Sequence, residues 1–198
     1  MYADYENSIV NLSCSILQYF GAKSEHSTLE YIDELLKGEY KNVVIILLDG
    51  LGVDALQYHL AKNGFFRKHL IREYSSVFPP TTTAATTSLE SGLTPFEHGW
   101  LGWSMYFSEV DKIVNAFVNT EKDTNIQAAD FHVANQFIPY ETIYKKIKDA
   151  GMANAYSVSK FGSNRIKLFD ELVDEIIRLC ATSEKKYIYG YWENPDSN

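Results

Sequence analysis

An apolar run that ends in a carboxylate constrains this chain more than any other feature: residues 42–50 read NVVIILLDG. Six consecutive apolar residues, Val43 to Leu48, are typical of a parallel strand at the centre of a sheet, buried on both faces. Gly50 provides a turn into a helix that the pattern predicts over 53–62. Because ligands of open α/β sheets bind at the carboxyl ends of the strands, Asp49 is a candidate functional residue.

The rest of the chain alternates between helical and strand-like patterns, which predicts a single α/β domain over 1–198 with a mainly parallel sheet covered by helices. The segment 98–136 departs from this alternation. It begins with aromatic residues, and a polar run over 119–127 follows a strand-like stretch at 113–118, so we expect a lid or insertion there. A first helix is predicted to end near Gly21. Further helices are predicted at 27–36 (capped by Ser27 or Thr28), 83–91, 139–149 and 166–181. Strands are predicted at 74–78, 153–158 and 186–192.

The end of the chain carries one more expectation. The last predicted strand, KKYIYGYW, runs into ENPDSN. A parallel strand that delivers Asp196 to the sheet edge is normally followed by further elements, so we expect the domain to be truncated at its C-terminus.

Composition excludes several classes of protein. The net charge of -8 over 198 residues argues against non-specific binding to nucleic acids or anionic membranes. Two cysteines, Cys14 and Cys180, are too few for a disulfide framework and are expected as two buried thiols. Neither a signal-peptide pattern nor an apolar run of about 18 residues is present, which favours a cytoplasmic protein.

A threonine cluster, Thr81 to Thr83, begins the predicted helix that follows the proline pair, and Thr82 lies 33 positions after Asp49. The start of a helix presents unpaired amide N–H groups and a positive dipole end, which favour anions. A carboxylate, a hydroxyl and a helix N-terminus together indicate metal-assisted chemistry on a phosphate or sulfate ester.

Three blocks of sequence, IILLDGLG, FPPTTTAATTSLESGLTPFEHG and YWENPD, resemble successive blocks of the alkaline phosphatase superfamily. They are most similar to its type I phosphodiesterase/nucleotide pyrophosphatase branch. The resemblance implies a site with two divalent metal ions, usually Zn²⁺. In that register, Asp49 matches a ligand of one metal, Thr82 matches the metal-bound nucleophile, and Asp196 matches a ligand of the other metal.

Two departures from the family pattern stand out. The later histidine and aspartate ligands that the resemblance implies are not in this sequence, so the chain is expected to hold part of the ligand set and could be inactive alone. Ala85 stands where the branch often has an asparagine that contacts the phosphoryl oxygens. Backbone N–H groups near Thr83 could replace that asparagine in part.

Other polar and aromatic residues have both functional and structural interpretations. His98 could bind a ligand, although a histidine that orders its loop is the commoner case. Lys160 and Arg165 could meet an anionic substrate or be ordinary surface cations. An aromatic cluster could stack on a nucleobase or pack in a core: Trp100, Trp103, Tyr106 and Phe107.

These observations predict a metal-dependent hydrolase of phosphoric esters, of the phosphodiesterase/nucleotide pyrophosphatase kind. The expected partner is a small-molecule phosphate ester, with no nucleic-acid polymer and no membrane. A phosphomonoesterase or phosphomutase of the same superfamily remains an alternative, as does a non-catalytic α/β binding module. Threonine at position 82 argues against a sulfatase, whose nucleophile is a modified cysteine or serine.

Overall fold

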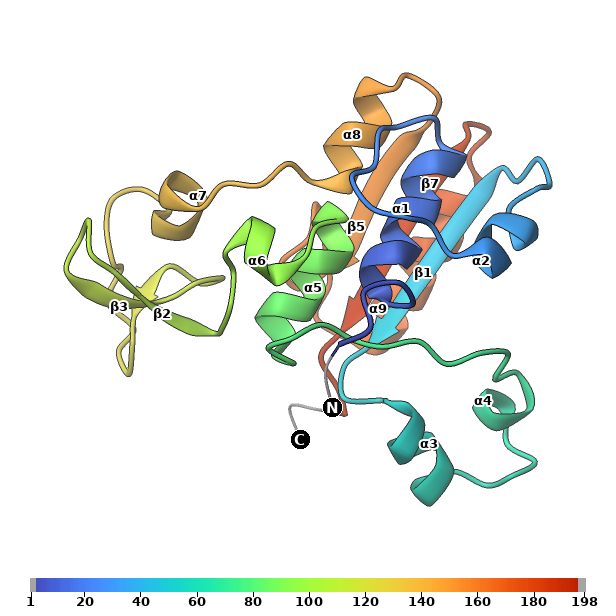
Figure 1. The fold of residues 1–198 in the computed structure, drawn as a ribbon, viewed down its shortest axis with the longest axis horizontal. Helices are drawn as coiled ribbons and strands as arrows, with labels where there is room; N and C mark the ends of the chain where they lie inside the picture. The colour runs from blue at the N-terminus through green and yellow to red at the C-terminus, as the bar shows by residue number, and fades with distance from the viewer. Residues whose placement is uncertain (1–2, 196–198) are drawn as a thin grey trace. The chain divides into compact units, whose positions relative to one another are not determined.

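A computed structural model describes residues 3–195 of the chain (Figure 1). The chain divides into two compact units. The first comprises Met1–Lys37 and Tyr74–Lys146, and the second comprises Gly38–Glu73 and Ile147–Asn198. Each unit is built from two separate stretches of sequence.

The second unit contains the parallel sheet, in the order β1-β7-β5-β6. The strands are β1 (Asn42–Leu48), β5 (Asn154–Ser159), β6 (Asn164–Arg165) and β7 (Lys186–Trp192), and the helices of this unit are α3 (Val53–His59), α4 (Phe65–Lys68) and α9 (Phe169–Ala181). Helix α8 (Ile143–Asp149) crosses the boundary between the units. A mainly parallel sheet flanked by helices confirms the predicted α/β class.

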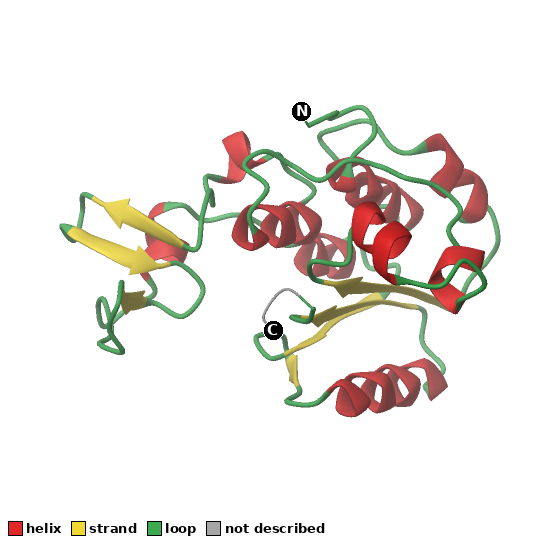
Figure 2. Ribbon diagram, turned by 90° about the horizontal axis from the view of Figure 1, so that it is seen from below, coloured by secondary structure: helices red, strands yellow, loops and turns green. Residues whose placement is uncertain are grey.

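Helix α9 covers one face of the sheet over β5 and β7, and Figure 2 shows this long helix lying along the strands. Its buried residues Leu172, Ile176 and Leu179 pack with residues of the sheet to form the core of the unit. Gly190 makes the close packing possible, because a Cβ atom there would lie 3.0 Å from Cδ1 of Ile176.

The prediction that the first strand is central and buried on both faces is wrong. Among the described strands β1 pairs with β7 alone, in a register that runs from Asn42 with Lys186 to Leu48 with Trp192. Because α9 packs over β5 and β7 instead, Val44 and Ile46 remain 37% and 48% exposed. Asp49 nevertheless lies at the carboxyl end of the strand, as predicted.

The first unit contains two packed helices and a small sheet. Helix α1 (Ile9–Tyr19) packs on α5 (Thr82–Ser91), and the Ser13 hydroxyl donates to the Leu89 carbonyl at 2.8 Å. Gly92 ends α5 in the left-handed conformation at φ 72°, which glycine adopts without strain. The remaining elements are α2 (Glu30–Leu35), α6 (Pro95–His98), β2 (Ser104–Phe107), β3 (Lys112–Asn115), β4 (Thr120–Glu121) and α7 (Val133–Phe137).

The segment 98–136 is ordered around its own small core. Strands β2, β3 and β4 form an antiparallel sheet in that order. Its buried face packs against α7, with Trp100, Phe107 and Val114 in the cluster. The predicted strand at 113–118 starts one residue earlier and ends at Asn115, and the polar run that follows contains β4. The role of this segment as a lid stays a prediction.

Several element boundaries differ from prediction, for local reasons. The predicted strand at 74–78 is reduced to a single bridge between Ser75 and Ser8, because two prolines follow and cannot donate to a ladder. Helix α2 begins after Leu29 rather than after Ser27 or Thr28, since the Thr28 hydroxyl donates to Asp33 instead.

Three further helices are shorter than predicted. Helix α9 starts at Phe169 because the Glu171 carboxylate accepts the N–H groups of Lys167 and Leu168. Helix α8 starts at Ile143, after the Thr142 hydroxyl accepts the Lys145 N–H. Helix α3 ends at His59 rather than at 62.

The two cysteines are free thiols, as predicted. Cys14 is buried, as predicted, whereas Cys180 is only half-buried, which differs from the expectation of two buried thiols. Burial raises the pKa of the Cys14 thiol, which keeps it protonated and unreactive at neutral pH. Within the described residues, no helix combines the length and the apolar character needed to cross a membrane.

Candidate active site

Asp49 follows β1 and continues its pairing with β7, because its backbone N–H donates to the Trp192 carbonyl at 3.0 Å. Both oxygens of its carboxylate accept hydrogen bonds. The Tyr191 hydroxyl donates to Oδ2 at 2.8 Å, and the Gly50 N–H donates to Oδ1 at 3.0 Å. The carboxylate is therefore held at the carboxyl edge of the parallel sheet, where α/β proteins bind their ligands.

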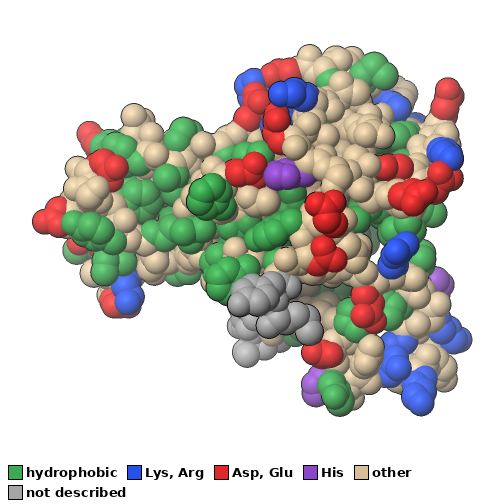
Figure 3. All heavy atoms as spheres, viewed as in Figure 1, with side chains coloured by type: hydrophobic (Ala, Val, Ile, Leu, Met, Phe, Trp, Pro, Cys, Tyr) green, Lys and Arg blue, Asp and Glu red, His purple; other side chains and the backbone are tan. Residues whose placement is uncertain are grey.

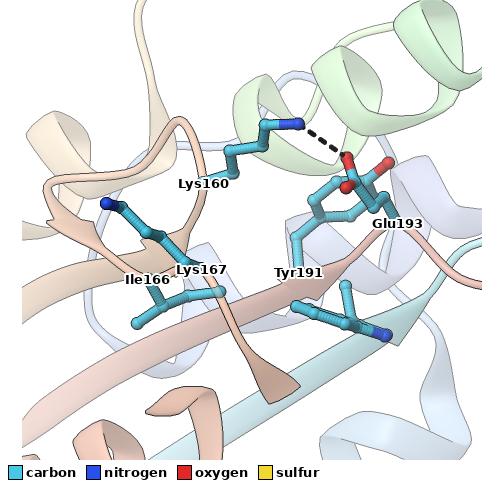
Figure 4. Close-up of a pocket in the computed structure, with 6 residues that line it drawn as sticks. Lys160, Ile166, Lys167, Tyr191 and Glu193 are labelled. Atoms are coloured by element: carbon cyan, nitrogen blue, oxygen red, sulfur yellow. Dashed lines mark ion pairs between the residues drawn. The ribbon is translucent and has the colours of Figure 1, made fainter.

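A small cavity lies at the same edge and shares Tyr191 with the Asp49 interaction. It measures about 110 Å³ and is lined by two lysines, two aromatic residues, one isoleucine and one glutamate: Lys160, Lys167, Tyr191, Trp192, Ile166 and Glu193. Figure 4 shows the side chains of Lys160 and Glu193 reaching toward each other, with 3.5 Å between Nζ and Oε2. Apolar walls with a few charged groups are typical of a small-molecule site.

Sequence reasoning considered Lys160 as a substrate contact but missed Tyr191 and Glu193. The signal was present in the strand YIYGYWE, since residues at the end of a parallel strand reach the ligand edge. Arg165 ends the short strand β6 and is exposed, in accord with its interpretation as a surface cation.

The three threonines at the start of α5 have different surroundings. Thr81 is the N-cap: its hydroxyl oxygen accepts the Ala84 N–H at 3.2 Å and its hydroxyl lies 3.3 Å from the Leu101 carbonyl. Thr83 is buried. Thr82 is the first residue of the helix and is partly exposed. Of the three, Thr82 alone combines access to solvent with a hydroxyl that is not the helix cap.

Helix α5 directs its N-terminus at this position, and amide N–H groups in the first turn of a helix have no intrahelical partner. Such groups favour an anion near the start of the helix. Ala85 offers no polar side chain, and it packs against the apolar cluster of Val10, Cys14 and Val77. The stabilisation of phosphoryl oxygens at this helix would therefore come from backbone groups.

The expected site residues are distributed over both units. Asp49 belongs to the second unit and Thr82 to the first. Asp196, the other expected metal ligand, lies outside the described residues. The part of the chain that the structure describes contains no group of three histidine, cysteine, aspartate or glutamate residues that could hold a metal ion. The Asp49 carboxylate has the donor chemistry of a metal ligand.

His98 has a structural role. It is buried, its Nδ1 accepts the Trp100 N–H at 3.0 Å, and its Nε2 lies 3.0 Å from the Ser88 hydroxyl. Burial lowers its pKa to about 4, so the ring is neutral with the proton on Nε2. These contacts fix the turn after α6, in agreement with the structural interpretation.

The aromatic cluster that follows is divided between the core and the surface. Trp100 and Phe107 are buried, and the Trp100 indole N–H donates to the Ile138 carbonyl at 2.9 Å. Trp103 and Tyr106 are exposed. Trp100 and Phe107 therefore pack in a core, in agreement with the structural interpretation of the cluster.

A parallel sheet flanked by helices, with a fixed carboxylate at its ligand edge and a threonine at the start of a helix, defines an α/β protein of the alkaline-phosphatase-like class. The family model for type I phosphodiesterase/nucleotide pyrophosphatase matches residues 43–198. The chain belongs to this family, which supports phosphoester hydrolysis in general as its class of activity. Searches of curated proteins and of solved structures found no match.

Proposed function

We propose that the chain is a metal-dependent hydrolase of phosphoric esters, with phosphodiesters as its first substrate class and Thr82 as its nucleophile. The observation that carries the assignment of Thr82 is the division of roles within the threonine cluster. Thr81 caps α5 and Thr83 is buried, whereas Thr82 starts the helix and is partly exposed.

Asp49, Thr82 and Asp196 are the residues proposed to bind two divalent metal ions, with Zn²⁺ preferred. Carboxylate and hydroxyl oxygens suit divalent cations, and zinc accepts carboxylate ligands. Bound cations supply Lewis acidity and lower the pKa of a coordinated hydroxyl. The Tyr191 and Gly50 donors orient the Asp49 carboxylate for this role.

In the proposed reaction the Thr82 hydroxyl gives its proton to solvent and its oxygen bonds to phosphorus, while the P–O bond to the leaving group breaks on the opposite side and the leaving alkoxide takes up a proton from water. The N–H groups at the start of α5 stabilise the charge on the phosphoryl oxygens. Water then cleaves the phosphothreonine ester and restores the hydroxyl. Lys167, which lines the cavity beside Tyr191, is proposed to meet an anionic portion of the substrate, and Lys160 could do so if it left its ion pair with Glu193.

Replacement of Thr82 by alanine tests the assignment. Thr82→Ala is expected to abolish turnover of bis(4-nitrophenyl) phosphate, by at least about a thousandfold, and to leave zinc binding largely intact because Asp49 and Asp196, the other proposed ligands, are unchanged. Thr82→Ser keeps a hydroxyl and is expected to retain measurable turnover. Full activity of the alanine variant would overturn the assignment.

Two alternative functions can be separated from the proposed phosphodiesterase by experiment. A phosphomonoesterase or phosphomutase of the same superfamily would keep the same site, so paired assays with 4-nitrophenyl phosphate and its diester separate these from a phosphodiesterase. A non-catalytic binding module is favoured by Ala85, which removes a phosphoryl contact. That module would bind phosphate esters without turnover in the wild type and in Thr82→Ala alike.

A further inference from the structure

Residues 58–72, YHLAKNGFFRKHLIR, form a basic and apolar surface segment that the proposed hydrolase activity does not use. The segment runs from the end of α3 past α4. It contains four lysine or arginine residues and no aspartate or glutamate, in a chain with a net charge of -8. Figure 3 shows Lys and Arg side chains gathered over the part of the molecule that α3 and α4 occupy in Figure 1. We call it the 58–72 surface.

Large apolar side chains of the 58–72 surface point into solvent. Tyr58 is 83% exposed, Phe65 is 70% exposed and Ile71 is 72% exposed. Phe66 and Leu70 are exposed as well. Several large apolar side chains exposed within one short segment are typical of an interaction site on a protein surface.

The 58–72 surface has a defined internal structure. The Arg67 guanidinium donates to the Gln57 and Leu60 carbonyls, at 3.0 and 3.3 Å, which ties α4 to the end of α3. The Phe65 ring lies 5.5 Å from the Phe66 ring, edge to face, and 4.5 Å from the His69 ring. The exposed rings are therefore held in place rather than left without support.

Two cations of the 58–72 surface, Lys62 and Lys68, are available to an external anion. In the described part of the chain, no ion pair joins Lys62, Arg67 or Lys68 to a carboxylate. Lys62 and Lys68 are exposed. A cluster of unneutralised cations beside exposed apolar groups has the chemistry of a protein segment that lies at a charged lipid interface.

We propose that the 58–72 surface docks the protein on an anionic lipid bilayer. The cations would meet the headgroups, and the rings and aliphatic chains would enter the boundary with the acyl chains. Leu70 and Ile71 favour lipid over nucleic acid, because aliphatic side chains offer no face on which bases stack. The net charge of the chain predicts no membrane partner. Charges farther than about 10 Å are screened at physiological salt, however, so the cations nearest the bilayer determine its electrostatic attraction.

Vesicle co-sedimentation of the whole chain tests this proposal. Vesicles of phosphatidylcholine with phosphatidylserine are expected to bind the chain, and vesicles of phosphatidylcholine alone are not. Lys62→Ala with Lys68→Ala is expected to weaken binding about 25-fold, at about fivefold per cation. Phe65→Ser with Ile71→Ser is expected to weaken it at least about tenfold, and added salt is expected to weaken it as well.

Matched controls use exposed residues of the same kinds outside this surface. Lys122→Ala with Lys148→Ala removes two cations, and Phe96→Ser removes a side chain that is 96% exposed; neither is expected to change vesicle binding. Circular dichroism verifies that each variant is folded. No binding to anionic vesicles, equal binding by the wild type and the Lys62/Lys68 variant, or binding of a single-stranded oligonucleotide without vesicle binding would each overturn the proposal.

Discussion

At the scale of single residues, Tyr191 fixes the orientation of the Asp49 carboxylate through a hydrogen bond of 2.8 Å. Tyr191→Phe removes this bond and keeps the ring that lines the cavity. Groups that orient a metal ligand typically contribute a factor of ten or more to metal affinity. We therefore expect the variant to bind zinc about tenfold more weakly, as measured by competition with a chromogenic chelator.

Tyr106→Phe is the matched control for this measurement. Tyr106 is exposed to solvent and, like Tyr191, donates to an aspartate at 2.8 Å, here Asp111, but Asp111 is not a proposed ligand. Zinc affinity is expected to be unchanged in the control. If Tyr191→Phe and Tyr106→Phe bound zinc equally well, the proposed role of Tyr191 would be refuted.

Glu90, near the end of α5, makes stability depend on pH. Burial raises its pKa to about 7, against the lowering effect of hydrogen bonds from Tyr144 and Tyr140. A raised pKa means that the folded state binds the proton more tightly than the unfolded state. The contribution of protonated Glu90 to the stability of the folded state is complete below about pH 4.5 and is lost as pH rises through about 7.

Glu90→Gln should therefore flatten the pH profile of unfolding. Between these pH values the wild type is expected to lose about 1 to 3 kcal/mol of stability relative to the variant. Thermal unfolding followed across this range measures the difference, with the exposed Glu109→Gln as control. Parallel profiles for the wild type and Glu90→Gln would contradict the assignment.

Residue-level features could be predicted where they depend on local sequence. Asp49 at a strand end and the free thiols of Cys14 and Cys180 are of this kind. The bond from Tyr144 to Glu90 joins residues 54 positions apart, and the bond from Tyr191 to Asp49 spans 142. No local pattern encodes such contacts, because they depend on how the elements pack.

At the scale of elements, Thr81 holds the start of α5 by accepting the Ala84 N–H. Loss of an N-cap hydroxyl costs about 1 kcal/mol. Thr81→Ala is expected to lower the free energy of unfolding by that amount in urea denaturation, whereas Thr81→Ser keeps the cap and is expected to match the wild type. Equal losses in both variants would show that the hydroxyl does not stabilise the helix.

The type and bounds of a helix or strand could be predicted where the sequence of that element itself marks them. The strand over 186–192 and the helix ending at Gly92 match the prediction, because a run of aromatic and β-branched residues marks the strand and a terminal glycine marks the helix. The position of β1 at the edge of the described sheet was not predictable, since an apolar run has the same appearance whether one or two strands flank it. The Thr142 hydroxyl and the Glu171 carboxylate accept backbone N–H groups, and these bonds place two helix starts several residues later than predicted.

At the scale of the whole molecule, charge is unevenly distributed. The chain is acidic as a whole, with a net charge of -8, yet residues 58–72 hold four cations and no acidic residue. The composition of the whole chain therefore predicts no membrane partner. The exposed cations and apolar side chains of the 58–72 surface lead instead to the proposal that it binds an anionic bilayer. A whole-chain average describes solubility better than it describes binding.

The family assignment also belongs to this scale. The family match covers residues 43–198 and includes residues of both compact units. The three sequence blocks were recognisable because they lie at strand and helix ends, where residue type is restricted by chemistry. The substrate was not predictable, because cavity-lining residues such as Ile166 and Trp192 come from separate elements and follow no motif.

The central claim is that phosphodiester hydrolysis by this chain requires a divalent metal ion. The most direct measurement is turnover of bis(4-nitrophenyl) phosphate with added zinc, after removal of metal by a chelator, and after zinc is restored. Turnover is expected when zinc is present, is expected to be lost on chelation, and is expected to recover when zinc is restored. Turnover that persists at the same rate after chelation would contradict this requirement.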